Sequence, residues 1–392
     1  MSPSRPAVRL RRPLRPTIRR GHPWLYDQAL GPLALPPGTI ATVVDHDGPI
    51  ATAMIDPDGP IRARVLDLDP VARIDDAWVA GRAAAAAGRR RVPPGLAATD
   101  ALRAIHGEND GLPGLTVDVY AGVAVVVFDG GAAAALWQPR WPAVRAGLVD
   151  GGVAVHATWT RGVRGARAAG HGDGAIPERI RIREGTAAFD VDVRHGQKTG
   201  FFLDQRANRA RVAELAAGAE VLNLCAYTGG FSVRAGLAGA ARVTSVDLAA
   251  PAIAAADRHW RLNGLAAAGH EGVVADAFAF LEDAVARGRR WDITIVDPPS
   301  FAASEAARPQ ALAAYQRLNR LALQATRPGG LLVSASCSSH VHEADLRAVL
   351  AEAGRTCGRD LRVVEVRGAD ADHPTLPAFP EGRYLQLLLA VT

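Results

Sequence analysis

The chain has 392 residues, of which 48% are hydrophobic and 22% charged, and its formal net charge is +5. This length and apolar content predict two or three domains, each with a hydrophobic core. No apolar run approaches the roughly 18 residues of a membrane span, and the N-terminus lacks the apolar core of a secretory signal. The three cysteines have unrelated spacings, which argues against a disulfide framework or a zinc site. We therefore expect a cytoplasmic protein with neither a membrane partner nor a bound metal.

Positive charge is concentrated at the start of the chain. The first 20 residues hold seven arginines and no acidic residue: Arg5, Arg9, Arg11, Arg12, Arg15, Arg19 and Arg20. Such a cluster is typical of a protein that binds phosphates, and Arg19 and Arg20 are our candidate substrate contacts within it. A solvated basic tail would explain the same residues equally well. Among the 45 basic residues Lys198 alone is a lysine, so it marks a position where a compact, flexible ammonium is needed.

Residues 1–75 predict a small β-barrel or sandwich. Short β-rich runs alternate there with turns of proline, glycine and aspartate, at residues 39–44, 50–55 and 61–66, and residues 21–30 are also strand-like. Residues 76–185 predict a second, smaller α+β unit. It begins with an alanine- and arginine-rich helix at residues 76–91, and a dense turn at residues 106–114 lies between strands. The sequence does not indicate what that turn does.

From about residue 186, strands and helices alternate through residues 331–336, which predicts a parallel sheet with helices on both faces. The expected strands are residues 221–224, 242–247, 272–275, 292–297, 331–336, 361–367 and 384–391. Seven is the number expected for the α/β, Rossmann-like fold of class I methyltransferases. Ligands of such sheets bind at the carboxyl ends of the strands, so the residues that follow each strand are the candidates for a site.

The stretch from residue 219 to residue 247 carries the most information about the ligand. Its first strand breaks into a turn at Gly229 and Gly230, a helix follows, and a second strand ends on Asp247. In a doubly wound sheet such glycines let the backbone approach a ligand, and such an acid hydrogen-bonds ribose hydroxyls. The G-x-G-x-x-G motif of nicotinamide-dependent enzymes is missing, which favours a ligand without a pyrophosphate.

Two further acids, Asp276 and Asp297, end predicted strands, and together with Asp247 they indicate S-adenosylmethionine as the ligand. The competing interpretation is that each acid only caps the helix after it. The expected cofactor contacts are Asn223, Ala226, Tyr227, Thr228, Gly229 and Gly230 around the methionine end, Asp247 at the ribose, Asp276 at the adenine amine, and also Asp297. Lys198 and Gln205 would reach the donor's carboxylate or a target phosphate, unless their stretch is only a hairpin turn with Asp204 as a helix cap.

These motifs resemble the RlmI-type large-subunit ribosomal RNA cytosine-5 methyltransferases over nearly the whole chain. The resemblance rests on residues 20–25, 106–114, 195–206, 222–231, 297–301, 336–338, 372–374 and 380–384. It implies an N-terminal PUA domain at residues 1–75, a central α+β domain at residues 76–185 and a methyltransferase domain at residues 186–392. It also implies ribosomal RNA, 23S in particular, as the partner, and a homodimer is compatible with it.

Carbon-5 of cytosine is a poor nucleophile, so methylation there needs a thiolate that first adds to carbon-6. Cys337 is the candidate, because it follows a predicted strand at the ligand edge, although most buried cysteines are only small hydrophobes. Asp297 would hydrogen-bond or protonate ring nitrogen 3. The prolines Pro298 and Pro299 would hold a carbonyl for the exocyclic amine, and Phe301 is a further candidate contact of the base.

The sequence departs from one related pattern and leaves two rival functions. Ser300 stands where another large group of RNA cytosine-5 enzymes has a second cysteine, and no base for the carbon-5 proton is assigned. Cys225 and Cys357 are interpreted as structural. A methyltransferase acting on a base nitrogen would place an aromatic residue directly after the two prolines, but Phe301 comes one position later. A non-catalytic RNA-binding assembly factor would not need the complete set of cofactor acids.

Overall fold

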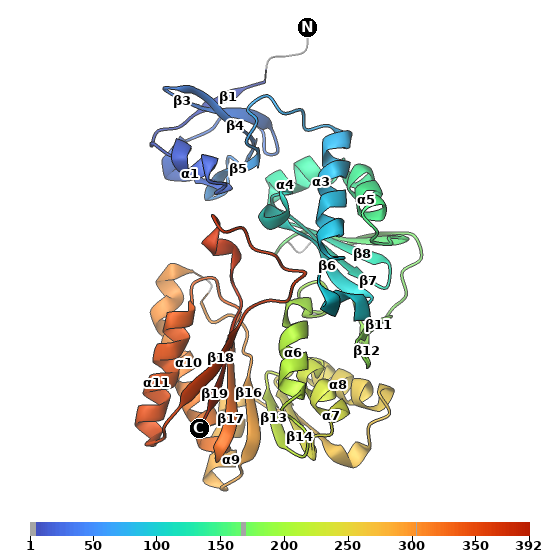
Figure 1. The fold of residues 1–392 in the computed structure, drawn as a ribbon, viewed down its shortest axis with the longest axis vertical. Coiled ribbons are helices and arrows are strands. Elements are labelled where there is room, and N and C mark those ends of the chain that lie inside the picture. The colour runs from blue at the N-terminus through green and yellow to red at the C-terminus, as the bar shows by residue number, and fades with distance from the viewer. Residues whose placement is uncertain (1–4, 166–169, 303) are drawn as a thin grey trace. The chain divides into compact units, whose positions relative to one another are not determined.

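The computed structural model describes residues 5–165, 170–302 and 304–392, which divide into two compact units (Figure 1). The first unit comprises Met1–Arg183, Asp190–Leu203 and Ala371–Gly382. The second comprises Glu184–Phe189, Asp204–Asp370 and Arg383–Thr392. Late in the chain, therefore, a short segment returns to the first unit before the last strand of the second. Among the described residues, every helix is too short or too polar to cross a membrane.

The N-terminal part of the first unit is a five-stranded sheet in the order β1-β3-β4-β5-β2. Its strands are β1 (Ala7–Arg9), β2 (Trp24–Tyr26), β3 (Ile40–Asp45), β4 (Gly48–Ile55) and β5 (Ile61–Asp67), and its helices are α1 (Arg15–Arg19) and α2 (Asp27–Leu30). Alternate residues of β3 are buried, as its alternating apolar pattern predicts. The three expected β-runs are strands, whereas the strand-like residues 21–30 become helical at Asp27. The expected β-rich N-terminal part is confirmed, and it also contains these two short helices.

The rest of the first unit is built on a second five-stranded sheet in the order β10-β9-β8-β7-β6. Its strands are β6 (Ala101–His106), β7 (Leu115–Tyr120), β8 (Val123–Phe128), β9 (Ala157–Val163) and β10 (His171–Asp173), and its helices are α3 (Asp76–Arg89), α4 (Gly131–Trp137) and α5 (Trp141–Asp150). Helix α3 begins where Asp75 accepts from the backbone N–H of Trp78, a side-chain cap.

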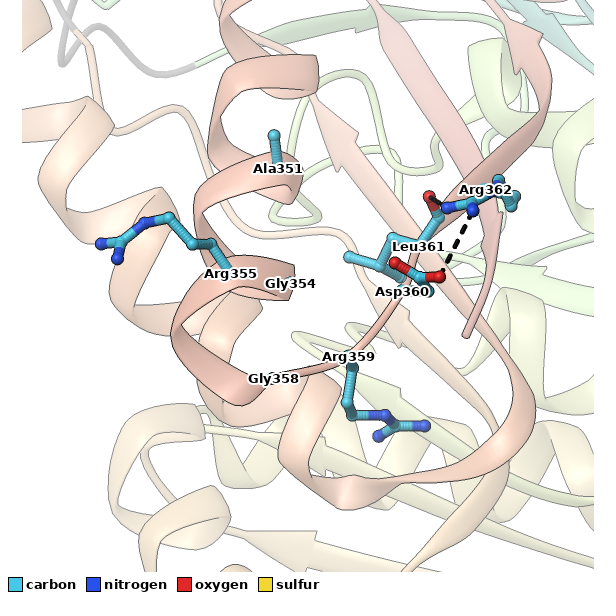
Figure 2. A pocket seen from close by; sticks show the side chains of 8 residues that line it. All are labelled: Ala351, Gly354, Arg355, Gly358, Arg359, Asp360, Leu361 and Arg362. Atoms are coloured by element: carbon cyan, nitrogen blue, oxygen red, sulfur yellow. Dashed lines mark hydrogen bonds and ion pairs between the residues drawn. The ribbon is translucent and has the colours of Figure 1, made fainter.

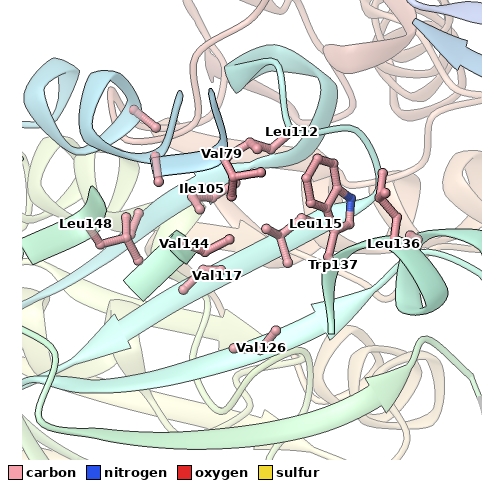
Figure 3. Packing of buried hydrophobic residues seen from close by; sticks show 14 of the residues in the cluster. Val79, Ile105, Leu112, Leu115, Val117, Val126, Leu136, Trp137, Val144 and Leu148 are labelled. Atoms are coloured by element: carbon pink, nitrogen blue, oxygen red, sulfur yellow. The ribbon is translucent and has the colours of Figure 1, made fainter. Parts of the chain in front are cut away.

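Apolar side chains of α3 and α5 pack on this sheet (Figure 3). Val79 from α3 and Leu148 from α5 meet strand residues such as Val117, and all three are fully buried. The two helices approach closely because Gly147 has no side chain: a Cβ there would lie 2.1 Å from the carbonyl oxygen of Ala80. The small central α+β part is thus confirmed. A separate two-stranded sheet pairs β11 (Ile180–Glu184) with β12 (Ala187–Val191).

The turn at residues 106–114 joins the two sheets of the first unit. Its short 3-10 helix Gly107–Asp110 carries Glu108, which accepts from the indole N–H of Trp24 at 2.8 Å and forms an ion pair with Arg64. Trp24 lies on β2 and Arg64 on β5. Since the buried Arg64 also pairs with the partly exposed Asp129 at 3.0 Å, two ion pairs of one buried arginine hold the N-terminal sheet to the central part. The turn therefore connects the N-terminal sheet to the central part, a structural role that its sequence does not indicate.

The segment Ala371–Gly382 is held on the first unit by Arg90 and Arg103, and by Asn109 of the same turn. Arg90 donates to the carbonyl oxygen of Asp372 at 3.0 Å, and the Asp372 carboxylate accepts from the backbone N–H of Arg103 at 2.9 Å. Asn109, in the turn, accepts from the backbone N–H of Leu376. These partners lie more than 260 residues apart in the chain, which is why no local pattern predicts them.

The second unit contains a seven-stranded sheet in the order β15-β14-β13-β16-β17-β19-β18. Its strands are β13 (Glu220–Leu224), β14 (Arg242–Asp247), β15 (His270–Val274), β16 (Trp291–Val296), β17 (Thr326–Ser336), β18 (Arg362–Arg367) and β19 (Gln386–Val391). Its helices are α6 (Arg206–Ala213), α7 (Gly230–Leu237), α8 (Ala250–Leu262), α9 (Ala277–Ala286), α10 (Arg308–Ala325) and α11 (Glu343–Cys357). The expected Rossmann-like fold with seven strands is confirmed.

Both faces of this sheet are covered by helices (Figure 1). On β13, Leu222 faces a core shared with α10 and α11, whereas Val221 faces one shared with α6, α7 and α8. Strands β13 to β17 are parallel, as the alternation through residues 331–336 predicts, whereas β19 runs antiparallel to both β17 and β18. The connection from β18 to β19 contains a short 3-10 helix (Pro380–Gly382) but no α-helix: the chain passes through the first unit and enters the sheet from the opposite end.

Candidate active site

The strand register of the second unit brings the predicted site residues to one edge. Leu224, the last residue of β13, pairs with Val246 on one side and with Val296 on the other. The residues that follow these three are Cys225, Asp247 and Asp297. On the next strand, Val296 pairs with Ser334, so β17 ends at the same edge just before Cys337. The carboxyl ends of four adjacent strands therefore present one cysteine-and-acid cluster, as the sequence predicts.

The turn after β13 is tightly wound around Asp247. Cys225 and Tyr227 have φ values of 55° and 48°, and Gly229 has 78°, so the backbone is left-handed at alternate positions. Asp247 accepts from the backbone N–H of Tyr227 at 2.8 Å and from that of Ala249 at 2.9 Å. At Gly229 a Cβ would lie 2.8 Å from the Cβ of Ala256 on α8. Glycine is needed there for helix packing as well as for its backbone conformation.

Other predicted cofactor contacts have structural partners. Asn223 is buried and donates to Ser232 at 2.9 Å, at the start of a polar chain through Ser245 to His270. Asp276 caps α9 by accepting from two backbone N–H groups, which is the competing interpretation of this acid. A carboxylate oxygen can accept more than one hydrogen bond, so capping and ligand binding are compatible.

Thr228 supplies an observation that fits a ligand in this turn. Its carbonyl oxygen accepts from His259 at 2.8 Å, but its hydroxyl is buried and, among the described residues, has no hydrogen-bond partner. Buried hydroxyls are seldom left unpaired in native structures. Ala226, two residues earlier, is buried, while the first helical residue Gly230 is half-buried. A polar ligand lying against the turn would satisfy the Thr228 hydroxyl.

Asp297 is joined to the helix that precedes β13. Its Oδ2 accepts from the side-chain amide of Gln205 at 3.0 Å, which brings Gln205 to this edge through a partner that the sequence does not indicate. The alternative role of Asp204 as a helix cap is wrong: Gln205 stands at the N-cap position of α6, and Asp204 instead accepts from the Tyr384 hydroxyl at 2.6 Å.

The turn that carries Cys337 is fixed to the loop after Asp297. The Ser338 hydroxyl donates to the carbonyl oxygen of Ala302 at 3.1 Å, and the Ser300 hydroxyl donates to the same oxygen at 3.3 Å. Cys337 itself is half-buried. The prolines Pro298 and Pro299 lie at the start of this loop. The Cys337 turn and the loop after Asp297 therefore share the Ala302 carbonyl as an acceptor, which holds the Cys337 thiol and the Asp297 carboxylate on one local structure.

Tyr315 on α10 is a residue of the site that the sequence analysis missed. Its hydroxyl donates to Ser336 at 2.9 Å, and its ring packs edge-on against Phe301 with centroids 5.0 Å apart. Burial raises the pKa of Tyr315, and the negative potential of Cys337 and Asp297 raises it further. The hydroxyl is therefore a neutral donor at physiological pH. No local signal marks it, since it lies in a helix with a regular apolar pattern.

The other two cysteines differ from Cys337. Burial raises the pKa of the Cys225 thiol to about 12, and the carboxylates of Asp247, Asp297 and Asp276 add to this effect. The Cys357 thiol contacts the carbonyl oxygen of Arg320 at 3.7 Å, and burial raises its pKa as well. Neither environment favours a thiolate, which agrees with the interpretation of both as structural.

The remaining predicted site residues belong to the first unit. Lys198 has a φ of 51°, and its ammonium lies 4.5 Å from the ring centroid of Phe202. Within the arginine cluster, Arg5, Arg9 and Arg15 form hydrogen bonds inside the N-terminal part, to Thr52, the Asp45 carbonyl and the Asp45 carboxylate respectively. Arg19 and Arg20 are exposed. The cluster is thus not a free tail: part of it stabilises the fold and part faces solvent.

Two cavities of the second unit lie away from this edge. One of about 440 Å³ is at the end of α11 (Figure 2), and its arginines already have partners: Arg355 pairs with Glu352, Arg362 with Asp360, and Arg359 donates to backbone carbonyls. Another of about 430 Å³ is lined by residues at the amino ends of strands, including Glu220 and Trp291. Neither of these two cavities is lined by a residue of the cysteine-and-acid edge.

Comparison with known families and proteins identifies the chain. A family model of S-adenosylmethionine-dependent methyltransferases matches residues 154–378, and one of PUA-like domains matches residues 8–68. A solved structure of SMU.776 in complex with SAH has the same fold, with a TM-score of 0.87 at 21% identity over 99% of this chain and 100% of that chain.

Curated relatives extend over most of the chain. A "Ribosomal RNA large subunit methyltransferase" of Deinococcus radiodurans is 38% identical over 386 residues, which cover 94% of this chain and 93% of the relative. A "Ribosomal RNA large subunit methyltransferase I" of Cronobacter sakazakii is 33% identical over 381 residues, covering 94% and 95%. The chain therefore belongs to the S-adenosylmethionine-dependent methyltransferases, in the RlmI-type family of ribosomal RNA large subunit methyltransferases.

Proposed function

We propose that the protein methylates carbon-5 of a cytosine in large-subunit ribosomal RNA through a covalent adduct on Cys337. The observation that carries this proposal is the shared anchoring of the Cys337 turn and the Asp297 loop on the Ala302 carbonyl. A thiol held beside an acid at the ligand edge of a methyltransferase sheet is what carbon-5 chemistry needs. The names of the relatives support large-subunit ribosomal RNA as the substrate.

In this proposal the cofactor lies against the turn after β13. S-adenosylmethionine, when bound, supplies an electrophilic methyl group on a sulfonium. Asp247 would accept from the ribose hydroxyls with its remaining lone pairs, and Asp276 would accept from the adenine amine. Asn223 and residues 226–230 would surround the methionine end, where the Thr228 hydroxyl gains the partner that it lacks among the described residues. Lys198 remains our candidate for the donor's carboxylate or a target phosphate.

The reaction follows from the chemistry of the base. The Cys337 thiolate adds to carbon-6, and the electron pair of the carbon-5–carbon-6 bond shifts through carbon-4 to nitrogen 3, which takes a proton from Asp297. The resulting enamine takes up the methyl group at carbon-5. A base or water then takes the carbon-5 proton, and the electron pair of that bond restores the carbon-5–carbon-6 double bond and expels the Cys337 sulfur as a thiolate, while nitrogen 3 returns its proton to Asp297. The Pro298–Pro299 segment and Phe301 would position the base.

A fluorinated substrate tests this mechanism directly. In RNA that carries 5-fluorocytosine, methylation can proceed but the fluorine cannot leave as a proton does, so elimination stops and the enzyme stays bound to its RNA. We expect an adduct that survives a denaturing gel, requires S-adenosylmethionine and disappears in Cys337→Ala. The controls Cys225→Ala and Cys357→Ala should still form it. Methyl transfer without an adduct would contradict the proposal and indicate a nitrogen as the acceptor atom.

A further inference from the structure

A chain of buried amides links Asp297 to an arginine on an outer strand of the same unit. Gln205 donates to Asp297 at 3.0 Å, and its amide oxygen accepts from Nδ2 of Asn208 at 2.6 Å. The Oδ1 of Asn208 in turn accepts from Nε of Arg367, on β18, at 2.9 Å. Gln205 and Asn208 are 2% and 1% exposed, so bulk water does not compete with these bonds.

Arg367 fixes the donor and the acceptor of every hydrogen bond between Arg367, Asn208, Gln205 and Asp297. A guanidinium has donors only, so the atom of Asn208 that faces Arg367 must be its oxygen. Its Nδ2 therefore points the other way, where the carbonyl oxygen of Gly368 accepts at 3.1 Å in addition to Gln205. With its own oxygen occupied, Gln205 can turn only its NH₂ group toward Asp297. The orientation of both amides thus follows from their partners and leaves no alternative assignment.

We propose that Asn208 is a positioning residue that, through Gln205, determines which oxygen of Asp297 carries the catalytic proton. The inference rests on the proposed function, in which Asp297 protonates nitrogen 3 of the target cytosine. Because Oδ2 must accept from Gln205, a proton on Asp297 is confined to Oδ1, and Oδ1 is then the oxygen offered to the base. Gln205 has in this view a different role from the contact with the donor's carboxylate that its sequence position suggests.

Asn208→Asp reverses the hydrogen bond between Gln205 and Asp297, because it changes which groups can donate but keeps the size and shape of the side chain. The new carboxylate cannot donate, so Gln205 must turn its NH₂ group toward it and present its oxygen to Asp297, which then holds its proton on Oδ2. We expect kcat for 5-methylcytosine formation on large-subunit ribosomal RNA transcribed in vitro to fall roughly tenfold to a hundredfold. The Kd for S-adenosylmethionine should change less than about twofold, since Asp247, Asp276 and the turn after β13, which hold the donor in the proposed function, take no part in these bonds.

Four further variants separate orientation from folding. Asn208→Ala leaves Gln205 unconstrained, so its kcat should lie between those of the wild type and Asn208→Asp. At Arg367, lysine should preserve activity because it also only donates, whereas Arg367→Met should not. Asn263→Asp is the matched control: Asn263 also makes two bonds through Nδ2 and one through Oδ1, to Ala188 and His259.

The outcomes distinguish the two proposals. A wild-type enzyme that makes no 5-methylcytosine on this RNA overturns the proposed function. An active wild type with Asn208→Asp within twofold of it overturns the positioning role alone. If Asn263→Asp loses as much kcat as Asn208→Asp at the same fall in melting temperature, the effect of Asn208 is structural and the inference is also overturned. A selective loss in Asn208→Asp, with retention in Arg367→Lys, supports it.

Discussion

Asp110 in the turn at residues 106–114 offers the most direct test of how the first unit is held together. Its side chain is 0% exposed and that of Arg90 is 2% exposed, and the two form a bidentate pair at 2.7 and 2.6 Å. Arg89 and the backbone N–H of His106 donate to the same carboxylate. Asp110→Asn removes the charge while keeping the size, and leaves the Arg90 guanidinium buried without its counterion.

Breaking a buried ion pair from one side costs about 3–5 kcal/mol, because the remaining charge stays desolvated. We therefore expect Asp110→Asn to reduce the free energy of unfolding of the first unit by that amount. Urea denaturation followed by tryptophan fluorescence measures it, since Trp24, Trp78, Trp137, Trp141 and Trp159 all belong to this unit. The exposed pair of Arg145 with Asp173 at 3.8 Å supplies the control, because Asp173→Asn should cost less than about 1 kcal/mol.

The pH dependence gives an independent check. Burial alone would raise the pKa of Asp110, but hydrogen bonds and attraction from Arg90 and Arg89 outweigh it and the pKa is lowered. The stabilisation is therefore complete above the unfolded pKa of about 3.9 and is lost as the pH falls through the lower folded value. The difference between wild type and Asp110→Asn should be constant near neutrality and shrink below about pH 4. A variant that loses less than about 1 kcal/mol at pH 7 would refute the reasoning.

The fold and the edge of the site could be predicted because their signals are local. Each strand of the second unit is a short apolar run followed by an acid or a turn, and parallel strands bring those ends together regardless of loop details. The sequence thus placed Asp247, Asp297 and Cys337 at one edge. The direction of β19 could not be predicted, because it depends on a connection that passes through the other unit.

Side-chain partners were the least predictable part. Tyr315 reaches Ser336 from a helix with an ordinary apolar pattern, and Glu108 meets Arg64 across two sheets. Neither pair has a fixed spacing that a single sequence would show. Asn208 is an intermediate case: it lies three residues after Gln205 at the start of a helix, a spacing that places both side chains on one face. That spacing could have drawn attention to it, although it does not name Arg367.

Two further predictions concern the ligands. Asp247→Ala should weaken S-adenosylmethionine binding by about 1–3 kcal/mol in calorimetry, because it leaves the ribose hydroxyls without an acceptor. The exposed Asp283 supplies the control, since Asp283→Ala should not change the affinity. Equal affinities of the wild type and Asp247→Ala would contradict the assignment of Asp247 to the ribose. Arg12, Arg19 and Arg20 are exposed, unlike the fold-stabilising Arg15, so replacing these three by glutamine should weaken RNA binding without unfolding the N-terminal sheet. If they neutralise phosphates of an accessible RNA loop, the slope of log K against log salt should flatten by about 0.7 for each phosphate that is no longer neutralised. Binding measured between low and moderate salt decides this: an unchanged slope, with RNA still bound, would show that these arginines only solvate the surface.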